Sequence, residues 1–157
     1  MAGDSGSAPA LDATNRRIIH ELVRDGRLSM RALAEKIHLS RAQAYVRVEQ
    51  LREAGVIEGF TARIGYGPAG LRASAFVGLS IRQDSWRGIA QSLRTLPFVE
   101  HVFLLGGELD VLVLVRATDN ATLRSVVLER LQALDGVRST RTWLIFEESP
   151  GPGAEWM

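Results

Sequence analysis

The segment Leu39–Ile57, LSRAQAYVRVEQLREAGVI, constrains what this chain can fold into more than any other stretch. Ser40 can begin a helix, because its hydroxyl accepts a hydrogen bond from a backbone N–H that has no partner in the helix. Gly55 can end one, because a residue without a Cβ adopts the left-handed conformation easily. The apolar residues between them repeat at helical spacing and are Ala44, Val48 and Leu51. The pattern predicts an amphipathic helix with one narrow apolar stripe.

The other side of this helix is polar and basic, which suits a groove edged with phosphates. Gln43 is the expected base contact, because a carboxamide can pair with adenine through two hydrogen bonds. Arg41 and Arg47 are expected to contact phosphates, although Arg47 could instead hold Glu21 or another acid within the same unit. The candidate DNA-contacting residues are Ser40, Arg41, Ala42, Gln43, Tyr45, Val46, Arg47 and Gln50.

Two further helices are expected before this one. Asp12 caps the first, which ends at Asp25-Gly26, and Ser29 caps a shorter second helix. Three residues, His38 to Ser40, separate the second helix from the third, and two short helices joined by so tight a turn are typical of a helix-turn-helix. A helical subdomain that only packs on something else is the alternative. The expected buried positions of the first two helices are Ile18, Ile19, Leu22 and Val23, followed by Leu33, Ala34 and Ile37.

Composition limits the class of protein without choosing among functions. The chain has 157 residues, of which 46% are hydrophobic, so it can form one domain or two small ones with packed cores. No apolar run approaches the roughly 20 residues that span a bilayer, and the first residues lack the basic and apolar regions of a secretory signal. The absence of cysteine excludes disulfides and thiolate chemistry and makes the cytoplasm the expected location. The net charge of +1 says nothing by itself about nucleic acid.

The second half of the chain predicts a sheet with helices. Residues 59–70 alternate apolar and polar side chains and then turn through Gly-Tyr-Gly-Pro-Ala-Gly, which predicts a linker strand and a hinge. Residues 71–148 follow the order βαββαβ of a ferredoxin-like α+β domain. The helix-turn-helix occupies residues 11–58, while residues 1–10 and 149–157 are expected to be a disordered and a flexible tail. Strands are expected over Ala73–Ile81, Val99–Leu105, Val111–Val115 and Val137–Phe146, and helices are expected to begin at Ser85 and Asp119.

The expected third strand argues for assembly. Its sequence, VLVLV, is apolar on both faces, whereas helices cover only one face of such an antiparallel sheet. A large apolar face that stays open to water marks an interface. We therefore expect two sheets to pack face to face in a homodimer.

The turn Gly106–Asp110 carries the chemistry expected of this half. Its two glycines let the backbone approach a ligand closely, and its peptide N–H groups could bind a carboxylate. Glu108 or Asp110 could accept a hydrogen bond from an ammonium group, so the turn suits an amino acid, whereas the alternative is a hairpin turn with solvated acids. No enzyme, metal or cofactor is expected, because the three histidines are scattered without metal-ligand spacing and there is no phosphate-binding glycine loop.

Residues 11–64 closely resemble the DNA-binding half of the Lrp/AsnC family, the leucine-responsive and asparagine regulators that are also called feast/famine regulators. The matching elements are Leu11-Asp12, Arg16-Arg17-Ile18, Asp25-Gly26-Arg27, Leu33-Ala34, Leu39-Ser40, Arg47-Val48, Leu51, Gly55-Val56-Ile57 and Gly59-Phe60-Thr61-Ala62. Two positions depart from the family, since Asn15 replaces the usual aspartate and His38 the usual glycine. The resemblance implies a bacterial-type transcriptional regulator of double-stranded DNA. It also implies that the linker strand pairs with that of a second subunit, in dimers that often assemble into tetramers or octamers.

The same resemblance bears on the turn before the third strand. The family carries a related Gly-x-aromatic-Asp turn that contributes to binding an effector amino acid where dimers meet, and Gly107–Asp110 fall on it with Leu109 in place of the aromatic residue. Thr140 and Thr142 match threonines near the same pocket, and Leu109 leaves the identity of the effector open. Trp143 is expected in the core, with the pocket wall as the alternative. The implied effector site comprises Gly106, Gly107, Glu108, Leu109, Asp110, Thr140 and Thr142.

Two alternatives to a DNA-binding regulator remain at this point. One is an amino-acid sensor or oligomer scaffold whose helical domain does not bind DNA. The other is an enzyme, because the siroheme decarboxylases share this two-module architecture. Those enzymes have lost the basic character of the third helix, whereas Arg41, Arg47 and Arg52 are present here.

Overall fold

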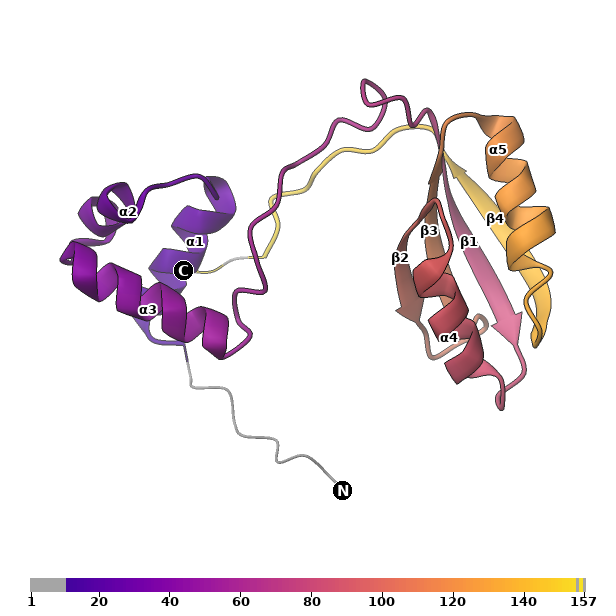
Figure 1. Cartoon of the computed structure of the whole chain (residues 1–157), viewed down its shortest axis with the longest axis horizontal. Coiled ribbons are helices and arrows are strands. Elements are labelled where there is room, and N and C mark those ends of the chain that lie inside the picture. The colour runs from indigo at the N-terminus through magenta and orange to yellow at the C-terminus, as the bar shows by residue number, and fades with distance from the viewer. Residues whose placement is uncertain (1–10, 155, 157) are drawn as a thin grey trace. The chain divides into compact units, whose positions relative to one another are not determined.

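The computed structural model describes residues 11–154 and 156, which form two compact units (Figure 1). The helical unit contains the chain up to Arg63 together with the segment from Pro150 onward, and the sheet unit contains Ile64–Ser149. The tail expected to be disordered, residues 1–10, lies outside the described residues. Among the residues described, no helix is long and apolar enough to cross a membrane.

The helical unit consists of three helices around one core. They are α1 (Ala13–Arg24), α2 (Met30–Ile37) and α3 (Arg41–Glu53). Each helix contributes three aliphatic residues, and the nine are Ile18, Ile19, Leu22, Leu33, Ala34, Ile37, Ala44, Val48 and Leu51. All nine are positions that the helical periodicity predicts. The exception is Val23, which was expected in this core but is 68% exposed, because it lies beyond the edge of the buried side of α1.

The predicted helix ends are confirmed. Asp12 accepts a hydrogen bond from the N–H of Asn15 at 2.6 Å, and Ser29 accepts one from the N–H of Ala32 at 3.1 Å. The third helix ends at Glu53, and Gly55, just beyond its cap, has a φ of 70°, the left-handed value that glycine adopts easily.

His38 is the residue that turns the chain out of α2. Its φ of 57° and ψ of 45° are left-handed, and its N–H bonds back to the carbonyls of Ala34 and Glu35. Glycine adopts this conformation without strain, whereas a residue with a Cβ is strained in it, although histidine tolerates it better than most. The helix-turn-helix therefore keeps its geometry at this position with some local strain.

Replacing His38 by glycine is expected to stabilise the chain. The change relieves a left-handed strain of roughly 1–2 kcal/mol and adds backbone freedom to the unfolded state that offsets about half of that gain. We expect a net gain of about 0.5–1 kcal/mol in the free energy of unfolding, measured by urea denaturation. The control is Glu35→Gly inside α2, which should lose about 1 kcal/mol. If His38→Gly loses as much stability as the control, the left-handed conformation does not strain His38.

The sheet unit has the βαββαβ order that the sequence predicts. Its strands form one antiparallel sheet in the order β2-β3-β1-β4, with all three pairings antiparallel. The fold is therefore α+β with a ferredoxin-like module. The elements are β1 (Ala73–Ile81), α4 (Trp86–Thr95), β2 (Val99–Leu104), β3 (Val111–Ala117), α5 (Asn120–Ser125), the π-helix η1 (Val126–Leu131) and β4 (Val137–Ile145).

Two local features differ from the sequence prediction. Ser85 precedes α4 as expected, but its hydroxyl does not cap the helix. The hydroxyl accepts a hydrogen bond from Arg82 and donates one to Asp84 at 3.0 Å. It is therefore bonded to the Arg82–Asp84 ion pair instead of to the backbone of the helix. The second predicted helix begins on its predicted cap, Asp119, but widens into the π-helix η1, which apolar periodicity alone does not distinguish from an α-helix.

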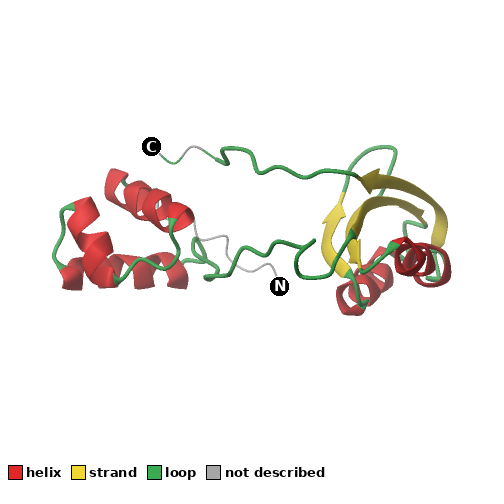
Figure 2. Ribbon diagram, turned by 90° about the horizontal axis from the view of Figure 1, so that it is seen from above, coloured by secondary structure: helices red, strands yellow, loops and turns green. Residues whose placement is uncertain are grey.

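The helices cover one face of the sheet and leave the other open (Figure 2). The covered face forms a core of alternate strand residues, such as Ala75, Val77 and Val113, with aliphatic residues of the helices. The opposite side, called the open face below, has large apolar side chains from all four strands. They are Phe76, Phe103, Leu112, Leu114 and Trp143. Trp143, expected in the core, is 42% exposed on this face, because it pairs with Phe76 across β4 and β1.

The predicted linker strand is not formed within the single chain. Residues 58–65 pair with no other strand of the described residues, and Phe60 and Ile64 are more than half exposed. A strand requires a neighbour to bond its backbone, and residues 58–64 form no backbone hydrogen bond with the other residues that the structure describes.

Candidate nucleic-acid interface and effector site

The outward face of α3 is open and carries both cationic and apolar groups. Arg41, Ala42 and Gln50 are exposed, and Tyr45 and Val46 are 56% and 52% exposed. The core holds the opposite stripe of the helix, so this face is fixed in place while it remains free for a partner. Two large apolar side chains beside an arginine are groups that base edges and sugar-phosphate backbones can contact.

Ser40 and Gln43 form a capping box at the start of α3. Ser40 Oγ accepts a hydrogen bond from the N–H of Gln43 at 3.2 Å, and Gln43 Oε1 accepts one from the N–H of Ser40 at 3.1 Å. Gln43 was expected to pair with adenine through two hydrogen bonds, which would require this capping bond to open. The spacing Ser-x-x-Gln is a known signal of a capping box, and it could have revealed this role from the sequence.

Arg47 connects α3 to the start of α1. Its Nη1 lies 2.6 Å from Asp12 Oδ2 and donates a hydrogen bond to Asn15 Oδ1 at 3.0 Å. This matches the alternative in which Arg47 holds an acid of the same unit, with Asp12 as that acid. Glu21, the other candidate, pairs with Lys36 at 2.7 Å.

Asp12 therefore serves as a helix cap and as an ion-pair partner. The hydrogen bond from Arg47 lowers the pKa of the Asp12 carboxyl, and the N–H of Asn15 lowers it further. Because the folded-state pKa lies below the unfolded one, the ionised carboxylate stabilises the fold above the unfolded pKa of about 3.9. This contribution is lost as the pH falls through the lower folded value.

Replacing Asp12 separates the two roles. Asp12→Asn keeps an N-cap but loses the charge, whereas Asp12→Ala should lose both and destabilise by about 1–2 kcal/mol near neutral pH. The difference between wild type and Asp12→Asn should shrink as the pH falls from about 6 to below about 3, measured by urea denaturation at each pH. A difference that stays constant over this range would show that the carboxylate charge contributes nothing.

The predicted effector turn closes the hairpin between β2 and β3. Gly106, Gly107 and Glu108 are exposed at its tip. Asp110 is held more firmly, since its N–H donates to the carbonyl of Leu79 at 3.0 Å and its Oδ2 accepts from the N–H of Ile81 at 2.8 Å. One carboxylate oxygen of Asp110 thus ties the turn to β1, which leaves Glu108 as the freer acid of the pair.

Leu109 lies on the open face, next to Trp143. Gly78 has no side chain there, and a Cβ at this position would lie 2.5 Å from Leu109 Cδ1 and 3.0 Å from Trp143 Cζ3. The glycine of β1 therefore provides the space in which Leu109 packs. The turn is joined to the open face through this side chain.

Thr140 and Thr142 lie on the other side of the sheet. They pair with Leu79 and Val77, whose side chains belong to the core under the helices, and Thr140 Oγ1 accepts a hydrogen bond from Gln132 at 2.7 Å. Cross-strand pairs share a face, so a single chain does not bring these threonines together with Leu109. Within the described residues, no cluster of three or more histidines or acids could hold a metal ion.

Comparison with known proteins agrees with both halves of the fold. A family profile for winged helix-turn-helix DNA-binding domains matches residues 11–58, and the Lrp/AsnC ligand binding domain matches residues 74–150. The HTH-type transcriptional regulator AldR of Mycolicibacterium smegmatis is 37% identical over 145 residues, which are 90% of this chain and 84% of AldR. The leucine-responsive regulatory protein of Klebsiella pneumoniae is 32% identical over 152 residues, 92% of each chain.

A solved structure of similar fold contains a ligand. The feast or famine regulatory protein from M. tuberculosis, complexed with L-methionine, matches with a TM-score of 0.86 and 30% identity. The match covers 94% of this chain and 100% of that one.

The chain combines a helix-turn-helix with a ferredoxin-like module, and its sequence matches assign this combination to transcriptional regulators. The sequence matches extend over nearly the whole chain and include both modules. The chain belongs to the Lrp/AsnC family of transcriptional regulators.

Proposed function

We propose that this regulator reads duplex DNA with α3, as a homodimer or a larger assembly of dimers, and that an amino acid bound at the Gly106–Asp110 turn modulates it. The exposed outward face of α3 carries this proposal, since a helix-turn-helix places such a face in the major groove with its N-terminal turn toward base edges. Catalysis forms no part of the proposal, and relatives at this identity are named as transcriptional regulators.

The residues proposed to contact DNA divide by chemistry. Arg41 is proposed to bind phosphates, which gives affinity that does not depend on sequence. Ala42 and Val46 can contact thymine methyl groups, and Tyr45 adds an aromatic face and a hydroxyl. Arg47 supports this surface by fixing α3 through Asp12.

The open face of the sheet supports assembly with a second copy. Its five apolar side chains come from all four strands, and three of them, Phe103, Trp143 and Phe76, are aromatic. Burying such a face contributes about 25 cal/mol for each Å² of apolar surface, before the costs of association. Two α3 helices in a dimer would read half-sites about 34 Å apart. The unpaired segment over residues 58–65 would gain a strand partner in the same dimer.

An amino acid is the proposed effector. The related regulator from M. tuberculosis has been solved as a complex with L-methionine. In this chain Gly106, Gly107 and Glu108 are exposed. The backbone N–H groups of the glycines suit a carboxylate, and Glu108 suits an ammonium group. Thr140 and Thr142 lie on the other side of the sheet, so their participation requires a second subunit.

Arg41→Ala is expected to weaken binding to all duplexes by a similar factor. It should also lower the slope of log affinity against log salt by about 1, because one phosphate contact is lost. Val46→Ala should instead cost on the order of 1 kcal/mol at individual thymine positions and leave the salt slope unchanged. Both are measured by fluorescence anisotropy with duplexes from the gene's own upstream region.

The matched control is Arg94→Ala, an arginine of α4 in the sheet unit. If Arg41→Ala binds like this control, α3 is not the DNA-contacting helix. If the wild-type chain shows no salt-dependent binding at all, the sensor or scaffold without DNA binding becomes the better description.

Glu108→Ala is expected to weaken amino-acid binding by roughly 10- to 150-fold, because a charge-assisted hydrogen bond contributes roughly 1.5–3 kcal/mol. Isothermal titration calorimetry with each amino acid on the wild type identifies the effector, and the same titration on the variant measures the loss. Glu129→Ala, an acid of η1, is the control. Binding that is unchanged in Glu108→Ala would place the effector elsewhere. If none of the amino acids gives a heat of binding to the wild type, an amino-acid effector is refuted.

A further inference from the structure

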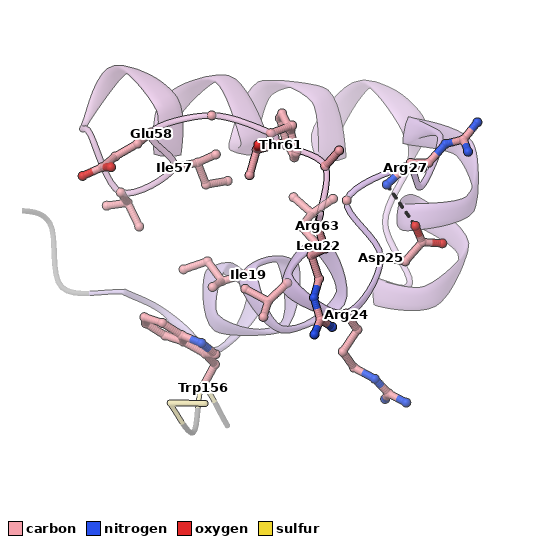
Figure 3. Close-up of a pocket in the computed structure, with 16 residues that line it drawn as sticks. Ile19, Leu22, Arg24, Asp25, Arg27, Ile57, Glu58, Thr61, Arg63 and Trp156 are labelled. Atoms are coloured by element: carbon pink, nitrogen blue, oxygen red, sulfur yellow. Dashed lines mark hydrogen bonds between the residues drawn. The ribbon is translucent and has the colours of Figure 1, made fainter. Parts of the chain in front are cut away.

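The helical unit has an apolar groove on the side of α1. Its volume is about 910 Å³, and it lies between α1 and the segment that follows α3 (Figure 3). Ile19 and Leu22 form its floor and are 6% and 8% exposed, while Phe60 on its wall is 52% exposed. None of the lining residues belongs to α3, so the groove is separate from the outward face of that helix.

A residue from far along the same chain, Trp156, lies in this groove. Trp156 packs against the core of the helical unit and lines the groove near Ile19 (Figure 3). The residues before it, Pro152–Ala154, lie beside His20 and Val23 of α1. The exposed position of Val23 is therefore next to the path of this segment. The sequence predicts a flexible tail over residues 149–157, whereas in the structure its last described residue is partly buried.

The other end of the segment is fixed in the sheet unit. Glu148 Oε2 lies 2.9 Å from Arg116 Nη1, and the Arg116 side chain is only 6% exposed. Arg116 also pairs with Glu100, donates to Ser74 at 3.2 Å, and has its guanidinium 3.7 Å from the ring centre of Tyr66. A buried arginine with this many partners has one conformation, so it holds Glu148 in a defined place.

We propose that residues 148–154 and Trp156 are a strap, clamped at its base by the Glu148–Arg116 pair and docked at its tip by Trp156 in the groove of its own chain. The strap would give the helical unit a second connection to the sheet unit, besides the linker that follows α3. The sequence between Glu148 and Trp156, Ser-Pro-Gly-Pro-Gly-Ala-Glu, contains two prolines that limit its freedom. The strap leaves the outward face of α3 uncovered, so it holds the DNA-binding unit without blocking it.

The absence of cysteine makes a direct test of docking possible. The full chain is labelled with 5-fluorotryptophan, and its Trp156 ¹⁹F resonance is assigned with Trp156→Phe. A nitroxide on the single cysteine of Arg16→Cys, an exposed site on α1 outside the groove, should broaden this resonance. Val23→Glu, which places a charge beside the tip, should remove the broadening. Val46→Glu, on the outward face of α3, is the matched control and should leave it.

Mixed samples decide which chain provides the strap. Subunits with fluorotryptophan but no nitroxide are combined with subunits that have the nitroxide but no fluorine. Broadening only when both labels share a chain supports the strap. Broadening in the mixed sample shows that the tip docks on a second copy, and no broadening in either sample shows that it does not dock. Either of these results overturns the proposal.

The consequence for DNA rests on the proposed function. Trp156→Ala should weaken binding to a duplex with two half-sites on the order of threefold to tenfold, because a less constrained helical unit loses more freedom on binding. Trp86→Ala, an exposed tryptophan of α4, should not change it. Unchanged affinity in Trp156→Ala would refute the holding role. A wild-type chain that binds no DNA would refute the proposed function, while the fluorine experiment would still decide whether the strap exists.

Discussion

The surface of α3 proposed to bind DNA depends on how this helix is held at its start. Its buried stripe is narrow, and Ala44 has few atoms with which to resist rotation of the helix about its axis. The capping box of Ser40 and Gln43 and the pair of Arg47 with Asp12 are directional contacts away from this stripe. An ion pair so exposed contributes only about 0.2–1 kcal/mol to stability. Its greater importance is therefore the orientation of the helix, which decides the side chains that face outward.

A similar dependence joins the two sites of the sheet unit. The helices bury one face of the sheet, whereas the apolar side chains of the open face have no helix over them in the single chain. Leu109 belongs both to the Gly106–Asp110 turn and, through the space above Gly78, to the open face. A ligand at the turn and a subunit on the open face would thus contact neighbouring atoms. This proximity offers a physical route by which a small molecule could alter assembly.

The features of the fold that could be predicted from the sequence are those that depend on neighbouring residues in the chain. The helix caps at Asp12 and Ser29, the strand β1 and the core positions follow from spacing and residue type within a few residues. The partner of Arg47 is 35 residues away in sequence, and the docking of Trp156 joins the far ends of the chain. No periodicity encodes such contacts, because they depend on how separate elements pack. Gln43 is the opposite case, because the local Ser-x-x-Gln pattern itself signals the capping role that the structure shows.

The capping role of Gln43 changes what the outward face of α3 can read. With the carboxamide oxygen bonded to the backbone of Ser40, the exposed groups nearest the start of the helix are the guanidinium of Arg41 and the methyl of Ala42, followed by Tyr45 and Val46. Methyl groups distinguish thymine from cytosine, but they do not provide the paired hydrogen bonds that identify adenine or guanine. The hydroxyl of Tyr45 and the carboxamide of Gln50 are other exposed groups of α3 that could make such bonds, and Arg41 would have to turn from phosphate to a guanine to add to them. Further discrimination would come from the shape and flexibility of the DNA between half-sites. Such readout depends on two α3 helices held at a fixed spacing, so the specificity of this protein would reside in its assembly as much as in its recognition helix.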